Sequence, residues 1–349
     1  VLKNSDVFLL FLLFISCGTK NKEYANNVFP YSQFPQEKEL KGEVIELDTA
    51  LFRYPFRIRI EGDKAIVLDL HGSDYYGHLF QYPSFRYLSS FGRRGDSPLE
   101  MLSMENFRLH NHTLDANKSE LTRLDFSSSG DSLLREETVA LDEDILRPLD
   151  FAIYNDTTFV IPDYSGESRF LKVDCKGKLI EKIGTIPTTN KKALQEARPA
   201  LAQAWRSFLD YNSHNSVLAT VTQLGEVVEI YNLKDSTHVI RVGEYDEPEF
   251  KVSDGYGIPT GIMGFSDVQV TDDAIYAVFH GTSFKDIARQ SGRLSDGGKY
   301  IYVFSLKGEP LCKYVLDHYI YGIWVDEVTK TIMATDVNND QPILKFSFG

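Results

Sequence analysis

The sequence contains little of several features that identify common protein classes. Cysteine occurs only three times in 349 residues, too few for a disulfide framework, so packing must stabilise the fold. Basic side chains number 37 against 50 acidic ones. The resulting net charge of −13 excludes a general nucleic-acid-binding protein, which needs a basic face to neutralise phosphates.

Short motifs of catalytic and metal-binding sites are absent as well. The chain has no G-x-S-x-G nucleophile elbow, no H-E-x-x-H or C-x-x-C metal motif and no S-x-D-x-G-x-T-W aspartate box. Residues 336–340 begin like a D-x-N-x-D calcium loop, but Gln341 stands where such a loop needs glycine. The sequence therefore predicts no catalytic residue, no metal ligand and no cofactor, and an enzyme is less expected than a binding protein.

Apolar and aromatic residues, by contrast, are plentiful. Hydrophobic residues make up 42% of the chain and aromatic residues 13%, which excludes a disordered or low-complexity chain. Tyrosine and phenylalanine, with 19 and 23 copies, are residues that strands favour. At 349 residues the chain is long enough for two domains, or for one large β-barrel or propeller.

The N-terminus carries the pattern of a targeting signal. Lys3 precedes an apolar run at residues 7–15, which is too short for a helix to span the ~30 Å core of a bilayer. The run fits the hydrophobic region of a secretory signal peptide. It ends in Phe14-Ile15-Ser16-Cys17-Gly18, which resembles the lipobox of bacterial lipoproteins. The resemblance implies that residues 1–16 are removed and that Cys17 is lipidated, which anchors the protein in the bacterial cell envelope.

The segment after the signal is expected to act as a tether. It is polar and contains lysine, asparagine, glutamine and proline, a composition typical of linkers. We therefore expect a signal peptide over residues 1–16, the lipidated cysteine with a flexible tether over residues 17–37, and one folded domain over residues 38–349.

Two kinds of β-hairpin alternate along this domain. Turns of the first kind fall near Gly62, Asn111, Asn155, His214, Asp272 and Val328, and turns of the second kind near Pro83, Ser129, Lys176, Lys234, Lys307 and Gly349. In five of the six pairs the two turns are 18 to 21 residues apart. Six units of about 52 residues with four strands each are typical of propeller blades. The sequence thus predicts an all-β fold, a six-bladed β-propeller.

The two ends of the domain are expected to close the ring. The last unit stops after its third strand, and Leu40–Leu47 offers a strand that fits the vacant place. An N-terminal strand that completes the C-terminal blade removes an exposed sheet edge.

Helical periodicity occurs in one stretch, residues 188–208. Leu194 belongs to a first short helix and Pro199 suits the first turn of a second one, after which Leu201 and Trp205 recur at helical spacing. We expect one helical insertion between blades 3 and 4 that packs its apolar stripe on the blades.

The remaining length variation falls on one face of the predicted ring. The turns within the hairpins are nearly constant, whereas the connections on the opposite face contain long insertions. Long loops on a rigid scaffold are common places for function. Arginine suits anionic ligands, and tyrosine and arginine are enriched in binding hot spots. The candidate ligand-binding residues are His71, Tyr75, Arg93, Arg94, Trp205, Tyr256, His280 and Arg289.

Each of these side chains also has a purely structural interpretation. Arg93 and Arg94 could be solvated loop charges or form an inter-blade salt bridge.

Aspartates recur near the ends of second strands and are expected to cap loop backbone rather than to act in catalysis: Asp69, Asp115, Asp163 and Asp336. Cys175 and Cys312 fall in non-adjacent blades, so we expect two free thiols, with Cys175 in a blade core.

Two stretches resemble a known class of propellers. Phe91–Pro98, which reads FGRRGDSP, and the strand-turn pattern of Ile301–Gly308 look like NHL-type six-bladed propellers. With the lipobox and residues 201–233, the chain from Lys38 onward resembles the TolB-like six-bladed propeller lipoproteins of Bacteroidetes. The resemblance implies a fold and an envelope location. Propellers of these two types act as platforms for proteins, peptides or other ligands, and no specific activity transfers.

Two functions remain open from the sequence. The first is a lipid-anchored, monomeric binding or scaffold protein that recognises a protein, peptide or glycan through its long-loop face. The alternative is a metal-dependent hydrolase or lyase with its site at the mouth of the central channel. Inward-facing carboxylates or histidines at that mouth would favour the enzyme, and an aromatic, patchy face would favour the binding protein.

Overall fold

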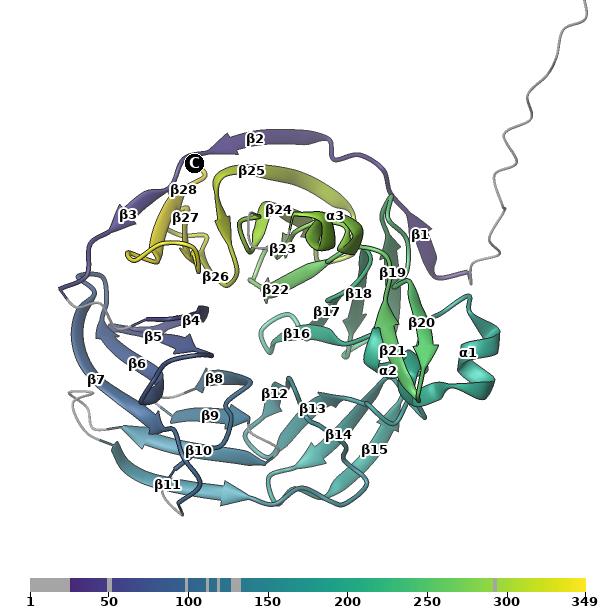
Figure 1. Cartoon of the computed structure of the whole chain (residues 1–349), viewed down its shortest axis with the longest axis horizontal. Helices are drawn as coiled ribbons and strands as arrows, with labels where there is room; N and C mark the ends of the chain where they lie inside the picture. Colours follow the sequence, from purple (N-terminus) through teal and green to yellow (C-terminus); the bar gives the residue numbers. More distant parts are fainter. Residues whose placement is uncertain are drawn as a thin grey trace, which may run out of the picture.

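The fold is a ring of β-sheets around a central axis (Figure 1). The computed structural model describes residues 26–48, 52–97, 100–110, 113–117, 120–126, 133–290 and 294–349. The expected signal peptide, Cys17 and the predicted turns at Asn111 and Ser129 lie outside these ranges. Within them, six sheets contain four or five strands each and a seventh sheet contains two. The predicted all-β, six-bladed propeller is confirmed.

In each blade, antiparallel strands follow one another from the centre outward. Blade 1 contains β4 (Pro55–Glu61), β5 (Lys64–Asp69), β6 (Tyr75–Gln81) and β7 (Arg86–Arg93). Blade 2 contains β8 (Asn106–His110), β9 (Thr113–Asn117), β10 (Leu121–Phe126) and β11 (Leu133–Val139). Blade 3 contains β12 (Ala152–Asn155), β13 (Thr158–Pro162), β14 (Phe170–Asp174) and β15 (Leu179–Ile183).

The second half of the ring repeats the arrangement. Blade 4 contains β16 (Ser207–Asn212), β17 (Val217–Thr222), β18 (Val227–Asn232) and β19 (Thr237–Val242). Blade 5 contains β22 (Phe265–Val270), β23 (Ala274–Phe279), β24 (Gly298–Ser305) and β25 (Pro310–Ile320). Blade 6 contains β26 (Ile323–Asp326), β27 (Thr331–Thr335) and β28 (Ile343–Ser347) from the C-terminus, with β3 (Glu43–Ile45) from the N-terminus.

The N-terminal segment closes the ring and also wraps around its outside (Figure 1). β3 pairs antiparallel with β28, which confirms the predicted closure. Two earlier strands add to the outer edges of neighbouring blades: β1 (Val28–Pro30) pairs parallel with β19, and β2 (Gln36–Leu40) pairs parallel with β25. The boundary of the expected tether at residue 37 was therefore set too late, because strand pairing begins at Val28.

An aromatic cluster and one carboxylate hold this wrap in place. The rings of Tyr31 and Phe34 pack edge-on against Phe304, with centroids 5.4 and 5.5 Å away. The Tyr31 hydroxyl donates to Glu226 Oε1 at 2.9 Å. Each added strand covers a sheet edge that would otherwise present unpaired backbone groups.

The helical insertion lies where the sequence predicts it, between blades 3 and 4. α1 (Lys191–Glu196) precedes α2 (Arg198–Ala204), and Pro199 lies in the first turn of α2. A third helix, α3 (Phe284–Arg289), lies in the long loop of blade 5 and was not predicted. Among the described residues, the helices are all too short to cross a bilayer.

A two-stranded hairpin protrudes before blade 5. It consists of β20 (Phe250–Ser253) and β21 (Tyr256–Pro259), and it lies beside α2 at the outer side of the ring (Figure 1). The backbone N–H of Gly257 in β21 donates to Gln203 Oε1 of α2 at 3.1 Å. Both thiols are free, as predicted: Cys312 is buried and Cys175 packs against the core of blade 3.

Carboxylates on or beside the innermost strands join blades 3, 4, 5 and 6 in succession. Asp150, just before β12, accepts from the backbone N–H of Leu209 in blade 4 at 3.0 Å. Asp210 of blade 4 accepts from Val270 N–H in blade 5 at 2.8 Å, and Asp267 of blade 5 accepts from Ile323 N–H in blade 6 at 2.9 Å. A carboxylate thus accepts from the inner strand of the following blade at three successive places in the ring.

Two of these carboxylates also form ion pairs with arginines of blades 1 and 2. Asp267, 1% exposed, pairs with Arg57 and Arg59 of blade 1, and Arg59 donates to the Ile323 carbonyl of blade 6 at 2.9 Å. Asp150 pairs with Arg108 of blade 2 at 2.9 Å. The two arginines beside Asp267 hold the pKa of its carboxyl well below its ordinary value, against the opposing effect of burial. Asp267 therefore stays charged in the folded protein.

We predict that Asp267→Asn strongly destabilises the ring. The substitution leaves Arg57 and Arg59 buried without a full counter-charge, and breaking a buried ion pair in this way costs about 3–5 kcal/mol. Urea unfolding followed by circular dichroism measures the loss. Asp63→Asn, at an exposed hairpin turn, is the matched control and should leave the unfolding midpoint unchanged. An unchanged midpoint for Asp267→Asn would show that the pairing does not stabilise the ring.

Candidate functional site

A cavity opens on the long-loop face, beneath the insertion of blade 5. Its volume is about 260 Å³, and α3, Gln290 and residues 294–297 contribute to its lining. The cavity combines apolar side chains with polar ones, and its lining includes Met263, His280, Ile287, Gln290 and Asp296. A mostly apolar concavity with a few convergent polar groups is the usual form of a ligand site.

His280 is the distinctive group in this cavity. It follows β23 directly and is only 8% exposed. Its Nε2 is buried and has no hydrogen-bond partner among the described residues. Burial lowers the pKa of His280 to about 4, so the imidazole is neutral at physiological pH. A buried ring nitrogen without a hydrogen bond costs free energy, and a ligand can supply that hydrogen bond.

A chain of rings leads from this cavity across the mouth of the channel to blade 1. The His280 ring lies 5.3 Å from that of Tyr321, Tyr321 lies 5.6 Å from Tyr54, and Tyr54 lies 5.0 Å from His71. The Tyr54 hydroxyl donates to Asp296 Oδ2 at 2.5 Å. These five residues define the long-loop mouth.

The electrostatics of the long-loop mouth keep its hydroxyls protonated. Burial, and then the neighbouring Tyr321 and Asp296, raise the pKa of Tyr54 far above its ordinary value. The pKa of Tyr321 is raised by burial in the same way. The mouth therefore offers neutral hydroxyl groups, the neutral imidazole of His280 and the side chain of Asp296 for hydrogen bonding.

Beneath the mouth, a buried guanidinium packs against two aromatic rings. The Arg57 guanidinium lies 4.6 Å from the ring centroid of Phe56 and 4.8 Å from that of Phe208. All three side chains are buried. In the part of the chain that the structure describes, no three histidine, cysteine, aspartate or glutamate side chains come together as a metal site. A cation–π cluster at this position gives no support to the metal-dependent alternative.

The structure places four of the predicted ligand-binding residues along the rim of blade 1. His71 is exposed and joins the long-loop mouth through Tyr54. Tyr75 and Arg93 are cross-strand partners on β6 and β7, and both are exposed. Arg94 is partly buried: its guanidinium lies 4.2 Å from the centroid of Tyr76 and donates to the Leu70 carbonyl at 2.9 Å. Arg94 therefore holds two loops together.

Three other predicted residues do not join the long-loop mouth. The prediction that Trp205 binds a ligand is wrong. Trp205 is 1% exposed and packs with Leu201 of α2 in the core under blade 4, so it cannot contact a ligand. Tyr256 is 58% exposed but lies on the protruding β20–β21 hairpin. Arg289 is exposed at the end of α3. Of the eight predicted residues, only His71 and His280 belong to the mouth.

The sequence predicts that four aspartates near the ends of second strands cap loop backbone, and the structure shows such capping for three of them. Asp69 accepts from the N–H groups of Arg53 and Tyr54 at 2.8 and 2.7 Å. Asp163 accepts from two serine N–H groups, and Asp336 from the N–H of Asn338. Asp115 differs, because it lies in the middle of β9 rather than at its end.

Three members of the long-loop mouth were missed from the sequence. Tyr54 lies in the linker before blade 1, Tyr321 in the two-residue connection between blades 5 and 6, and Asp296 near the end of the blade 5 insertion. None carries a motif. Their separation in sequence hides a proximity that only the closed ring creates.

Comparisons with known proteins agree with the observed fold. The profile described as "TolB-like 6-blade propeller-like" matches residues 33–328. A Bacteroides fragilis protein named as exported is similar with a TM-score of 0.56 and 12% identity, covering 91% of this chain and 98% of its own. No curated protein sequence matches.

Two further solved structures have the same fold. A member of the DUF4221 family from Bacteroides vulgatus has a TM-score of 0.53 and 9% identity, with 89% of this chain and 96% of its own covered. A protein named as an auxiliary nutrient binding protein, from Bacteroides ovatus, has a TM-score of 0.53 and 10% identity, with 85% and 70% covered.

The buried imidazole predicts a pH dependence of stability. Its folded pKa of about 4 lies below the ordinary value of 6.5, so the unfolded chain binds more protons between these two pH values and stability falls as the pH falls. Between pH 7 and pH 5, the wild type should lose about 2 kcal/mol of unfolding free energy relative to His280→Phe. Urea titrations of both proteins at the two pH values measure this difference. Parallel pH dependence would contradict the assignment of a buried, neutral His280.

Proposed function

The chain belongs to the family of TolB-like six-bladed propellers, and from that premise we propose that it is a binding protein of the cell envelope. Its long-loop mouth receives a group of a protein, peptide or glycan partner. The observation that carries this proposal is the cavity of about 260 Å³ with the unpartnered Nε2 of His280. The similar structures named as exported and as nutrient-binding support such a role.

The shape and lining of the cavity define what can enter. Its volume, below the usual ~300–1,000 Å³ of small-molecule pockets, fits one side chain or one small ring better than a large cofactor. Met263 and Ile287 provide apolar contact, and His280 and Asp296 lie where a polar end of the entering group can be bound. Around it, the exposed side chains of Tyr75, Arg93 and Arg289 supply further contacts of the types enriched at interfaces.

A lipid at Cys17 would give this mouth a defined orientation. β1 runs parallel to β19, so the chain reaches the propeller from the side of the short hairpin turns. Asn27 contacts His238, near the start of β19, with Asn27 Nδ2 at 3.2 Å from His238 Nδ1. The segment from Cys17 to Asn27 reaches at most about 35 Å. In this proposal the short-turn face lies toward the bilayer and the long-loop face points away from it.

Capture from the protein's own envelope tests the cavity directly. Ser295 lines the cavity with an exposed side chain, so Ser295→Trp should block entry without disturbing the core. We expect the variant to retain a partner about tenfold more weakly, or worse, than the wild type. Val328→Ala, at a 93% exposed site on the opposite face, is the matched control and should bind as the wild type does. Equal retention by Ser295→Trp would rule out the cavity as the contact.

The anchor is tested separately. Cys17→Ser removes the sulfur that would carry the lipid, so the protein should move from the membrane fraction to the soluble fraction and lose incorporation of a labelled fatty acid. Labelling that persists in the variant would show that Cys17 is not the attachment site.

A further inference from the structure

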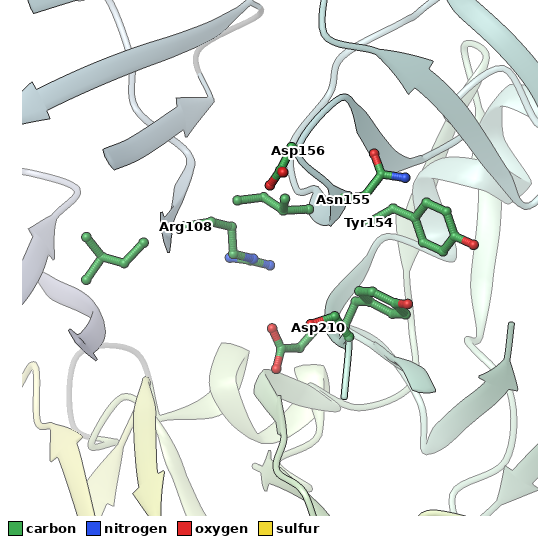
Figure 2. Close-up of a pocket in the computed structure, with 9 residues that line it drawn as sticks. Arg108, Tyr154, Asn155, Asp156 and Asp210 are labelled. Carbon is green, nitrogen blue, oxygen red and sulfur yellow. The ribbon is translucent and has the colours of Figure 1, made fainter. Parts of the chain in front are cut away.

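A second cavity lies at the other end of the central channel, where the short hairpin turns are. Its volume is about 340 Å³, and the inner strands of blades 2, 3 and 4 line it. Figure 2 shows Arg108 of β8 and Asp210 of β16 pointing into the same space from different blades. Tyr154 and Asn155 of β12 and Asp156 of the turn after it also line the cavity.

One polar group in this cavity is buried and incompletely satisfied. Arg108 is 6% exposed, and its two terminal nitrogens donate to Asp150 and to the carbonyls of Phe107 and Leu209. Its Nε is buried and has no partner among the described residues. An N–H left in this state costs free energy, and a ligand oxygen could satisfy it.

Asp210 provides the complementary acceptor. Its Oδ2 accepts from Val270 N–H at 2.8 Å, and the lone pairs of a carboxylate can accept further hydrogen bonds. The carboxylate lies in a partly buried position, where the surrounding protein screens it less than water would. Donor and acceptor thus line one cavity, from the inner strands of blades 2 and 4.

This pairing favours a neutral hydroxyl over an ion. A hydroxyl can accept from Arg108 and donate to Asp210 at once, because its oxygen has both a proton and lone pairs. A cation would satisfy Asp210 but face the Arg108 guanidinium. An anion would satisfy Arg108 but face Asp210 and Asp156. Either ion would lose its hydration and would lie beside a group of its own charge, and both effects cost free energy.

The rest of the lining suits a ring that has apolar faces and polar edges. The rings of Tyr154 and Tyr211 lie 5.3 Å apart and are tilted by 44°. Leu109 and Ile153 add aliphatic surface, and Asn155 and Ser213 add groups that both donate and accept hydrogen bonds. The volume falls at the lower end of the ~300–1,000 Å³ typical of small-molecule sites, enough for one or two sugar rings.

We propose that this short-turn cavity binds one ring of a neutral saccharide, with adjacent hydroxyls between Arg108 and Asp210 and the ring against Tyr154 and Tyr211. The site lies at the opposite end of the channel from the long-loop mouth. It stands whether or not the long-loop mouth binds a partner.

The test is binding of defined sugars to the full chain, kept in a detergent without a sugar headgroup. Methyl glucoside, methyl galactoside and N-acetylglucosamine are the probes, and ethanolammonium and acetate are the charged comparisons, with saturation-transfer NMR and calorimetry as readouts. We expect at least one sugar to bind with a Kd of about 1 mM or tighter, and neither ion to compete.

Variants locate the site. Asp210→Asn keeps an acceptor for Val270 N–H but loses the charge, and Ser213→Trp fills the entrance from an exposed position. Both should weaken sugar binding about tenfold or more, whereas Ser295→Trp at the other mouth should not change it. Ser213→Trp remains decisive if Asp210→Asn unfolds. The proposal is overturned if no sugar binds, if ethanolammonium binds and depends on Asp210, or if Ser213→Trp binds sugar as the wild type does.

Discussion

The buried contacts between carboxylates and the next blade are the constraint on which the ring depends. Asp150, Asp210 and Asp267 each accept a backbone N–H from the inner strand of the following blade. A carboxylate in such a place is stable only when its hydrogen bonds and its counter-charge are both present. Arg57 and Arg59 of blade 1 supply the counter-charge for Asp267, and Arg108 of blade 2 supplies that for Asp150.

These contacts also determine what the two ends of the channel can do. At the long-loop end, Arg57 pairs with Asp267 and lies over phenylalanine rings, and the cavity lies beneath α3. At the short-turn end, Arg108 pairs with Asp150 and lines the second cavity, and its Nε has no partner among the described residues. Buried arginines thus pack against aromatic rings at one end of the channel and line a cavity at the other.

Much of the fold could be predicted because repetition is a property of the sequence itself. The described turns at Gly62, Lys176 and Lys307 lie between paired strands, and the N-terminal strand completes blade 6. Capping by Asp69 also followed from its place at the end of a strand. The wrap of β1 and β2 was missed, since short polar segments such as Gln36–Leu40 read as linker until an open sheet edge is known to lie beside them.

The candidate site could be predicted only in part. His280 was found because it lies in a long insertion, but its partners Tyr54 and Tyr321 come from two other connections of the ring, and no spacing in the sequence reports contacts across the ring. Trp205 was misassigned for a related reason. Helical periodicity shows that a side chain belongs to an apolar stripe, and here that stripe faces the core beneath blade 4 rather than the mouth.

The central claim is that a partner enters the cavity beside His280. Photo-crosslinking in intact cells tests it most directly, with a photoreactive side chain in place of Ser295 at the cavity or of Val328 on the opposite face. We expect a discrete crosslinked species from position 295 and none from position 328. A species from position 328 alone would contradict it and would place the binding surface on the other side of the propeller.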